Sequence, residues 1–276
     1  MVKAKERQMQ APHTELQETT MADLVELNPK DHRHLKVKPD CAIQVARNQH
    51  LINIKVNEVG NAMTCFPIFI TRAQNQNDWS ISAITSFEVD GNLFVKDADW
   101  DASYIPSGMQ TYPFFLMNSP TKERQFTMGI DVDNPAFSED DGEAIFVDEN
   151  KASDYLSRVA TQLESDIKNE YHSFQFVHKL EELDLIKPMD LQVHYQHGAV
   201  NTLKGLHTVD EEKLQKLDID QLEELRTKGY LGPIYGMLMS IYQLNALLKR
   251  HNQYGDLKPV VQVKLDPAKD EAATEA

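Results

Sequence analysis

The sequence predicts a single α+β domain, with an antiparallel, β-rich N-terminal half packed against a helical C-terminal half and with disordered termini. Apolar and polar residues alternate at period two before residue 130, whereas apolar residues recur at spacings of three and four after residue 150. Neither an internal repeat nor a linker-like change of composition divides the chain. We therefore expect one domain over residues 23–255, between disordered tails at 1–22 and 256–276.

The β-rich part spans residues 36–130, and an antiparallel meander is its simplest arrangement. Pro67 must lie at the start of its strand or at an unpaired position, because proline cannot donate a ladder hydrogen bond. Turn formers at Asn48-Gln49 and Asp90-Gly91 separate the runs. The expected strands lie within 41–46 (CAIQVA), 51–56 (LINIKV), 63–71 (MTCFPIFIT), 79–89 (WSISAITSFEV) and 93–95 (LFV).

The mainly helical part spans residues 151–255. Its first helix has Ser153 as N-cap, continues or kinks near Tyr171, and is stopped by Pro188. A small hairpin over 191–207 is expected around Gly198. Three later helices carry these signals: a capping box at Thr208–Glu211, a start at Asp220 with Gly229 as C-cap, and Pro233 in the first turn of a last helix with an apolar face reaching Leu248.

Small residues recur at every fourth position of this last helix, at Gly232, Gly236 and Ser240. Such spacing lets another backbone approach closely. The partner is either a segment of the same chain, which we favour, or the same helix of a second subunit in a homodimer. Residues 230–248 carry no charge, but their polar residues favour a packed helix over a membrane span.

Acidic residues give the chain a net charge of −15, with 43 acidic against 28 basic side chains. Over half of this charge lies in residues 131–150, which hold eight acidic and no basic residues. Nucleic acid is therefore an unlikely partner, since phosphate would be repelled. The segment lacks the glycine and final glutamate of an EF-hand, so we expect a solvated loop or a docking site for a basic partner. Its candidate docking residues are Asp131, Asp133, Glu139, Asp140, Asp141 and Glu143.

Cys41 and Cys65 lie in apolar runs, which predicts two buried thiols in a reducing compartment. Neither has a neighbouring basic cluster that would lower its pKa, so neither is expected to be a nucleophile. The histidine pairs lack the three or four converging ligands of a metal site. The chain carries no secretory signal and no motif of a hydrolase, nucleotide-binding or metalloprotease site. We expect a cytoplasmic protein with no catalytic residues, no metal and no cofactor.

Aromatic residues are concentrated between Trp100 and Phe115. Rings provide contact area and hydroxyls orient a ligand, so this composition suits a peptide or aromatic-ligand pocket. The alternative is a loop folded over its own core, which we favour because aromatic residues more often fill cores. The candidate binding residues are Trp100, Asp101, Tyr104, Tyr112 and Phe114.

Several motifs together resemble the bacterial SapC family over about residues 23–250. The most specific is the tryptophan of Trp100–Pro106 with the Tyr112-Pro113 pair. At Met109-Gln110-Thr111 the chain departs from relatives that often carry basic residues there, so no anion-binding role is carried over. The other matching segments are 23–34, 66–69, 92–95, 146–150, 205–214 and 229–231 with the helix that contains Ser240.

The resemblance implies an accessory role in surface-protein handling, peptide modification or receptor-linked uptake. Genes for many members lie beside those for outer-membrane receptors, tryptophan-halogenase-like proteins and cupin-like proteins. It implies no catalytic residue. Our leading hypothesis is a non-catalytic protein that binds a peptide or protein partner around Trp100–Phe115 and through the acidic loop. The competing hypothesis is an enzyme component, a metal- or cofactor-dependent oxygenase or peptide modifier, with its site near the same segment.

Overall fold

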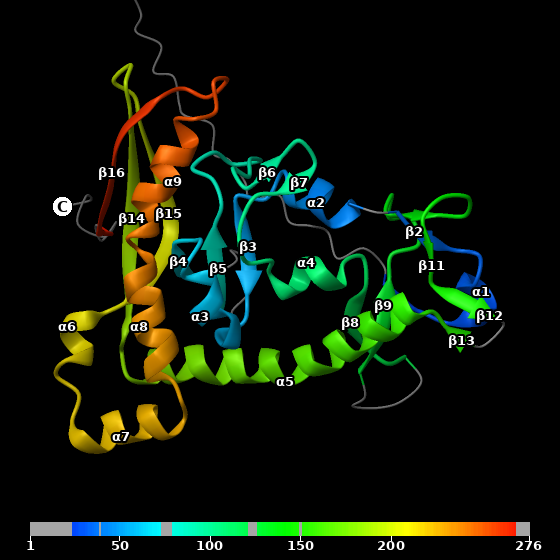
Figure 1. Cartoon of the computed structure of the whole chain (residues 1–276). Helices are drawn as coiled ribbons and strands as arrows, with labels where there is room; N and C mark the ends of the chain where they lie inside the picture. The colour runs from blue at the N-terminus through cyan, green and yellow to red at the C-terminus, as the bar shows by residue number, and fades with distance from the viewer. Residues whose placement is uncertain (1–23, 39, 73–78, 121–125, 149–150, 269–276) are drawn as a thin grey trace, which may run out of the picture.

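The computed structural model describes residues 24–38, 40–72, 79–120, 126–148 and 151–268. Two hydrophobic cores lie along one long helix, α5 (Asp154–Glu182), which runs along the lower side of the molecule in Figure 1. The first half of α5 contributes Leu156, Val159 and Leu163 to the smaller core. Its second half contributes Phe176, Val177 and Leu180 to the larger one. The helix therefore joins the two parts through its apolar face.

The larger core is built on a six-stranded antiparallel sheet with the strand order β16-β14-β15-β4-β5-β3. In β14 the buried Met189, Leu191, Val193 and Tyr195 alternate with more exposed residues, so one face of this strand packs on the core. The strands are β3 (Leu51–Ile54), β4 (Ile68–Arg72), β5 (Trp79–Ile84), β14 (Ile186–Tyr195), β15 (Val200–Val209) and β16 (Val260–Pro267).

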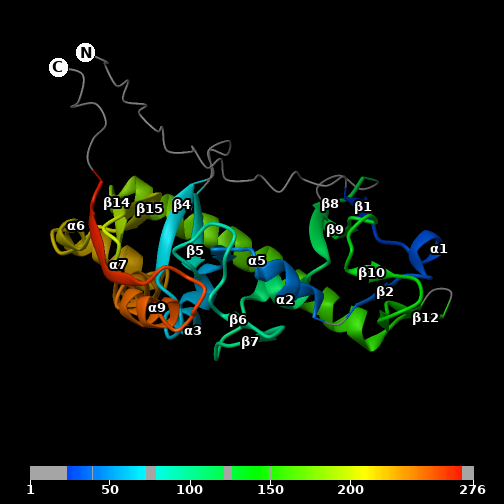
Figure 2. The same cartoon turned by 90° about the horizontal axis from the view of Figure 1, so that it is seen from above.

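Short strands lie around the N-terminal half of α5, as Figure 2 shows from above, and the smaller core is formed by residues in and beside these strands and in α5. Phe114, Ile130 and Ile145 are its most completely buried side chains. Two sets of three short strands, with the orders β1-β9-β8 and β10-β2-β11, surround it. Their bounds are β1 (Val25–Glu26), β2 (Lys36–Val37), β8 (Phe115–Asn118), β9 (Phe126–Ile130), β10 (Phe137–Ser138) and β11 (Glu143–Ala144), followed by the pair β12 (Phe146–Asp148) and β13 (Lys151–Ala152).

Short helices and one further strand pair complete the described part. Gly236 and Ser240 of α8 face the protein interior: a Cβ on Gly236 would lie 2.9 Å from Val59, and Ser240 accepts a 2.9 Å hydrogen bond from the Ile68 amide. These elements are α1 (Pro29–His32), α2 (Cys41–Ala46), η1 (Val56–Glu58), α3 (Val59–Ala62), β6 (Val95–Lys96), β7 (Asp99–Trp100), α4 (Ser107–Thr111), α6 (Glu211–Leu214), α7 (Ile219–Thr227), α8 (Leu231–Ser240) and α9 (Gln243–His251).

The predicted fold class is confirmed, with strands dominating the first half and helices the second. Ser153 caps α5 by accepting the Leu156 amide, Pro67 immediately precedes β4, and the hairpin turns at Gly198. Gly229, with φ of +73°, follows α7 as expected. These signals are local, since each depends on a few neighbouring residues.

The predicted meander is wrong in three places. Residues 41–46 form helix α2 instead of a strand, so the hairpin at Asn48-Gln49 does not exist. A six-residue apolar run fits either element, and here packing of α2 against α4 decides. Furthermore, β3 pairs with β5 instead of β4, while Val95 pairs with Trp100 in a separate hairpin.

Several expected boundaries in the second half are also corrected. Helix α5 ends at Glu182, and Pro188 lies inside β14. Asp210, not Thr208, caps α6, and Asp218 caps α7. The last helix is divided near Tyr242 into α8 and α9. Part of the C-terminal segment expected to be disordered forms β16, while residues 1–22 and 269–276 lie outside the described residues.

Candidate binding site

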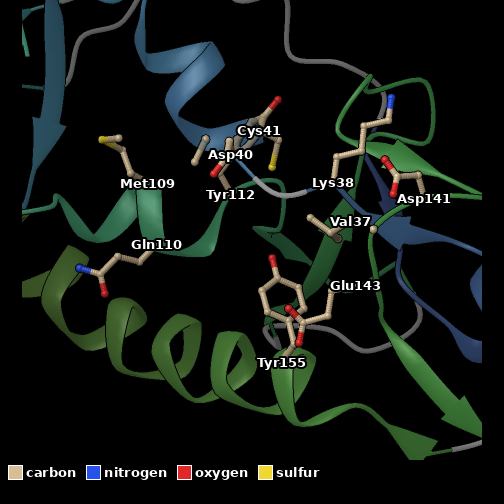
Figure 3. Close-up of a pocket in the computed structure, with 12 residues that line it drawn as sticks. Val37, Lys38, Asp40, Cys41, Met109, Gln110, Tyr112, Asp141, Glu143 and Tyr155 are labelled. Atoms are coloured by element: carbon tan, nitrogen blue, oxygen red, sulfur yellow. The ribbon is translucent and has the colours of Figure 1, made fainter. Parts of the chain in front are cut away.

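A cavity of about 560 Å³ opens where α2, α4, the first turn of α5 and the acidic loop approach one another. Figure 3 shows Glu143 beside the Tyr155 ring on one side of the site, with Met109 and Gln110 of α4 on the other. Tyr112 and Tyr155 provide its aromatic walls. The complete lining consists of Val37, Lys38, Asp40, Cys41, Ala42, Met109, Gln110, Tyr112, Asp141, Gly142, Glu143 and Tyr155. The cavity therefore combines part of the predicted aromatic segment with part of the predicted acidic loop.

Tyr112 connects the end of α4 to the acidic loop. Its hydroxyl donates a 2.9 Å hydrogen bond to the side-chain oxygen of Asn134, which also accepts the Ala136 amide at 2.9 Å. Asn134 therefore stabilises a turn and fixes a cavity wall with the same oxygen atom. The Tyr112 ring packs edge-to-face against Phe115, with 6.0 Å between the ring centroids.

The acidic loop is held against β2 by contacts that leave little room for movement. Gly142 has φ of +116°, and a Cβ there would lie 2.4 Å from the carbonyl oxygen of Val37. Glycine is required at this position for both reasons. The ammonium of Lys36 donates to the Asp140 carbonyl at 2.9 Å, and that of Lys38 donates to the Pro135 carbonyl at 3.0 Å. The loop is thus a fixed wall of the cavity.

Burial favours the neutral forms of the two tyrosines and the cysteine that line the cavity. Burial raises the pKa of Tyr155 to about 12, with further contributions from the nearby Cys41 and Glu143. Burial likewise raises the pKa of Cys41 and of Tyr112. The Tyr155 hydroxyl makes no hydrogen bond to any part of the chain that the structure describes, and it points into the cavity in Figure 3. It is available to a ligand as donor or acceptor.

The remaining acidic-loop candidates lie outside the cavity lining. Asp131 accepts the Asp133 amide within the loop, and Glu139 lies 3.5 Å from the exposed His34. The Asp140 side chain is exposed, and only its neighbours Asp141 to Glu143 reach the cavity.

The remaining aromatic candidates belong to the two cores. Trp100 donates to the Tyr104 carbonyl at 2.8 Å and packs beside Phe66 and Phe94. Phe114 is 1% exposed. The preferred alternative, a loop over its own core, therefore describes Trp100 and Phe114, but Tyr112 lines the cavity.

Tyr104 belongs to a buried polar cluster that joins the aromatic segment to η1 and α5. Its hydroxyl donates to Glu58, which also accepts from the backbone and hydroxyl of Ser107. The ammonium of Lys55 lies 3.3 Å from the Ser107 hydroxyl and 3.6 Å from the buried Asp166 carboxylate. These contacts join the aromatic segment to η1 and α5.

A second cavity, of about 440 Å³, surrounds Cys65 on the other side of the aromatic segment. Asp101 lies at its wall and forms a 2.6 Å ion pair with Arg250, whose guanidinium is 4.3 Å from the Phe94 ring centroid. The Cys65 sulfur lies 3.1 Å from the Ser103 hydroxyl. Burial opposes ionisation of this thiol, but hydrogen bonds from Ser103, Thr64 and the backbone of Tyr104 outweigh burial and lower its pKa.

The prediction that both cysteines are buried is wrong. Both thiols are partly exposed instead of buried, and each lines one of the two cavities. The donors that lower the Cys65 pKa come from residues distant in sequence, so the absence of a neighbouring basic cluster was not informative.

The sequence also gave no indication that Met109, Gln110 and Tyr155 would meet. Tyr155 follows the N-cap of α5 and is part of no motif. In the sequence, Met109 and Gln110 stand out only for their place within the aromatic segment and for the departure from relatives at that position.

Within the described residues, no three His, Cys, Asp or Glu side chains converge as metal ligands. No helix there combines the length and hydropathy needed to cross a membrane.

Comparison with family models gives one match. The model of the SapC family matches residues 27–247 of the chain. The chain belongs to the SapC family. The match confirms the resemblance predicted from the motifs, and the SapC span contains every residue that lines either cavity except those of the second cavity beyond residue 247. No curated protein and no solved structure matches the chain.

Proposed function

We propose that this SapC-family chain is a non-catalytic accessory protein that binds a peptide or protein partner in the cavity between α4 and the acidic loop. One observation carries the proposal: Tyr112 and Glu143, from the two segments expected to bind a partner, line the same cavity. A volume of about 560 Å³ is within the usual range of ligand sites.

Preorganisation of the walls supports this role. Asn134 fixes Tyr112, and Gly142 lies against Val37, so a ligand would meet side chains already in place. Binding then costs less ordering entropy than it would at a flexible loop. The proposed setting is the cytoplasm, in surface-protein handling, peptide modification or receptor-linked uptake.

A peptide-display library panned against the purified chain tests the proposal. Ala42→Phe fills the first cavity, and Ala102→Phe is the matched control because Ala102 lines the second cavity. We expect enriched peptides to lose affinity at least about tenfold on Ala42→Phe and to retain it on Ala102→Phe. Circular dichroism confirms that both variants fold. Equal binding to Ala42→Phe and to the original chain would refute the proposed site.

An enzyme component remains the competing proposal, because the low-pKa Cys65 thiol contacts Ser103 within the aromatic segment. Its site would be the second cavity. Peptide binding that survives Ala42→Phe but is lost on Ala102→Phe would place the binding site in the second cavity.

A further inference from the structure

Carboxylates reach the first cavity from two separate segments. Asp40 lies at the start of α2, whereas Asp141 and Glu143 belong to the acidic loop. None of the three forms an ion pair with a residue in the described ranges. Carboxylates at a partly enclosed site produce a negative potential that attracts a cation.

Lys38 is the basic residue of the lining, and in Figure 3 its side chain lies on the same side of the site as Asp141. Its ammonium donates to the Pro135 carbonyl, and in Figure 3 the side chain extends away from Tyr155 and Glu143. The described lining therefore holds three carboxylates against one ammonium that already has an acceptor. A positively charged ligand would balance this excess.

The other walls suit a cation carried on an alkyl chain. Val37, Met109 and the rings of Tyr112 and Tyr155 provide apolar and aromatic surface beside the carboxylates. Lysine and arginine bury their methylene stems against such surface while the charged end meets an acidic group. Ring faces add an attraction for ammonium or guanidinium groups. In Figure 3, Glu143 lies beside the Tyr155 ring, which places the two kinds of wall together.

We infer that the first cavity takes the cationic side chain of a lysine or arginine presented by a basic peptide partner. This inference rests on the proposed function and names the ligand class of the same site. Glu143 pairs with the cation beside the Tyr155 ring, which holds the alkyl stem, and Asp141 adds to the negative potential of the site. A free polyamine has the same charge chemistry but no peptide backbone, so the test includes one.

Fluorescence anisotropy with labelled hexa-arginine, hexalysine and hexaglutamate tests this ligand class on the full chain at low ionic strength. Asp141→Asn with Glu143→Gln removes two charges from the cavity. Glu139→Gln with Asp140→Asn is the matched control, because it removes two charges from the same loop outside the lining. We expect the cavity variant to weaken hexa-arginine or hexalysine binding at least about tenfold, and the control less than about twofold.

Four results would overturn the inference. Equal weakening by both variants would show diffuse attraction to an acidic surface. Hexaglutamate binding as tightly as the basic peptides would exclude a cationic ligand. Spermidine that displaces hexa-arginine at an equal concentration would assign the site to free polyamines. If the peptides enriched by display were neutral or acidic and lost their affinity on Ala42→Phe, only the ligand class would be overturned, since the proposed function would still hold.

Discussion

The hydroxyl of Tyr104 donates a 2.5 Å hydrogen bond to the carboxylate of Glu58, which is 4% exposed. Glu58 also accepts the Lys55 amide at 2.8 Å, the Ser107 amide at 2.8 Å and the Ser107 hydroxyl at 2.9 Å. Burial, together with the bond to Glu58, raises the pKa of Tyr104. This carboxylate thereby fixes the segment that leads into α4, and so supports the wall of the first cavity.

Glu58→Gln should destabilise the fold. One carboxylate oxygen that now accepts hydrogen bonds would be replaced by an amide nitrogen, which would face hydrogen-bond donors and could accept none of them. We expect a loss of about 2–3 kcal/mol in the free energy of unfolding, measured by urea denaturation. Glu170→Gln is the control, since Glu170 lies 3.9 Å from Lys55 but is 73% exposed. An equal effect of the two substitutions would contradict the role given to Glu58.

Alanine substitution at the two glycines of α8 should change the free energy of unfolding in opposite directions. At Gly236 a Cβ would lie 2.9 Å from Val59 and 3.2 Å from Met63, so Gly236→Ala should cost about 1–3 kcal/mol through overpacking. At Gly232 nothing lies within 4 Å of the added atom, and helix propensity should stabilise Gly232→Ala by up to about 1 kcal/mol. Thermal unfolding measures both. A destabilised Gly232→Ala would instead indicate that this position contacts a second subunit.

The two thiols should differ in their reaction with iodoacetamide. Burial raises the pKa of Cys41, whereas hydrogen bonds hold that of Cys65 below its ordinary value. Cys65 therefore holds more thiolate at any pH below its ordinary pKa and should be labelled several-fold faster. Mass spectrometry of peptides from a pH series measures both rates. Ser103→Ala removes one donor and should slow Cys65 alone; faster labelling of Cys41 would refute the assignment.

Stability should fall as the pH is lowered from neutrality. Burial lowers the pKa of His32, His50 and His207 below the ordinary 6.5, so the unfolded chain binds protons more readily than the folded one. Their contribution to stability is complete above pH 6.5 and is lost as the pH falls towards their folded pKa values. Urea denaturation across this range measures the slope. His207→Gln should reduce the slope, and substitution of the exposed His197 should leave it unchanged.

Local signals predicted the elements whose geometry depends on a few adjacent residues. Ser153 caps its helix whatever lies beyond it, and Gly198 permits the turn between two long strands. Residues 41–46 mark the limit of this reasoning, because six apolar and polar residues fit a strand as well as a helix. Their helix forms where α4 can pack against it.

The sequence by itself determined the α+β class, the SapC motifs, the position of the acidic loop, the Ser153 cap of α5 and the glycine that follows α7. Tertiary structure alone decided that Tyr112, Glu143 and Tyr155 line one cavity, that Phe114 is buried in the smaller core while Trp100 packs against the larger one, and that Ser103 lowers the pKa of Cys65. The reason is physical: periodicity and capping act between neighbours in the chain, whereas a cavity depends on which distant segments pack along α5.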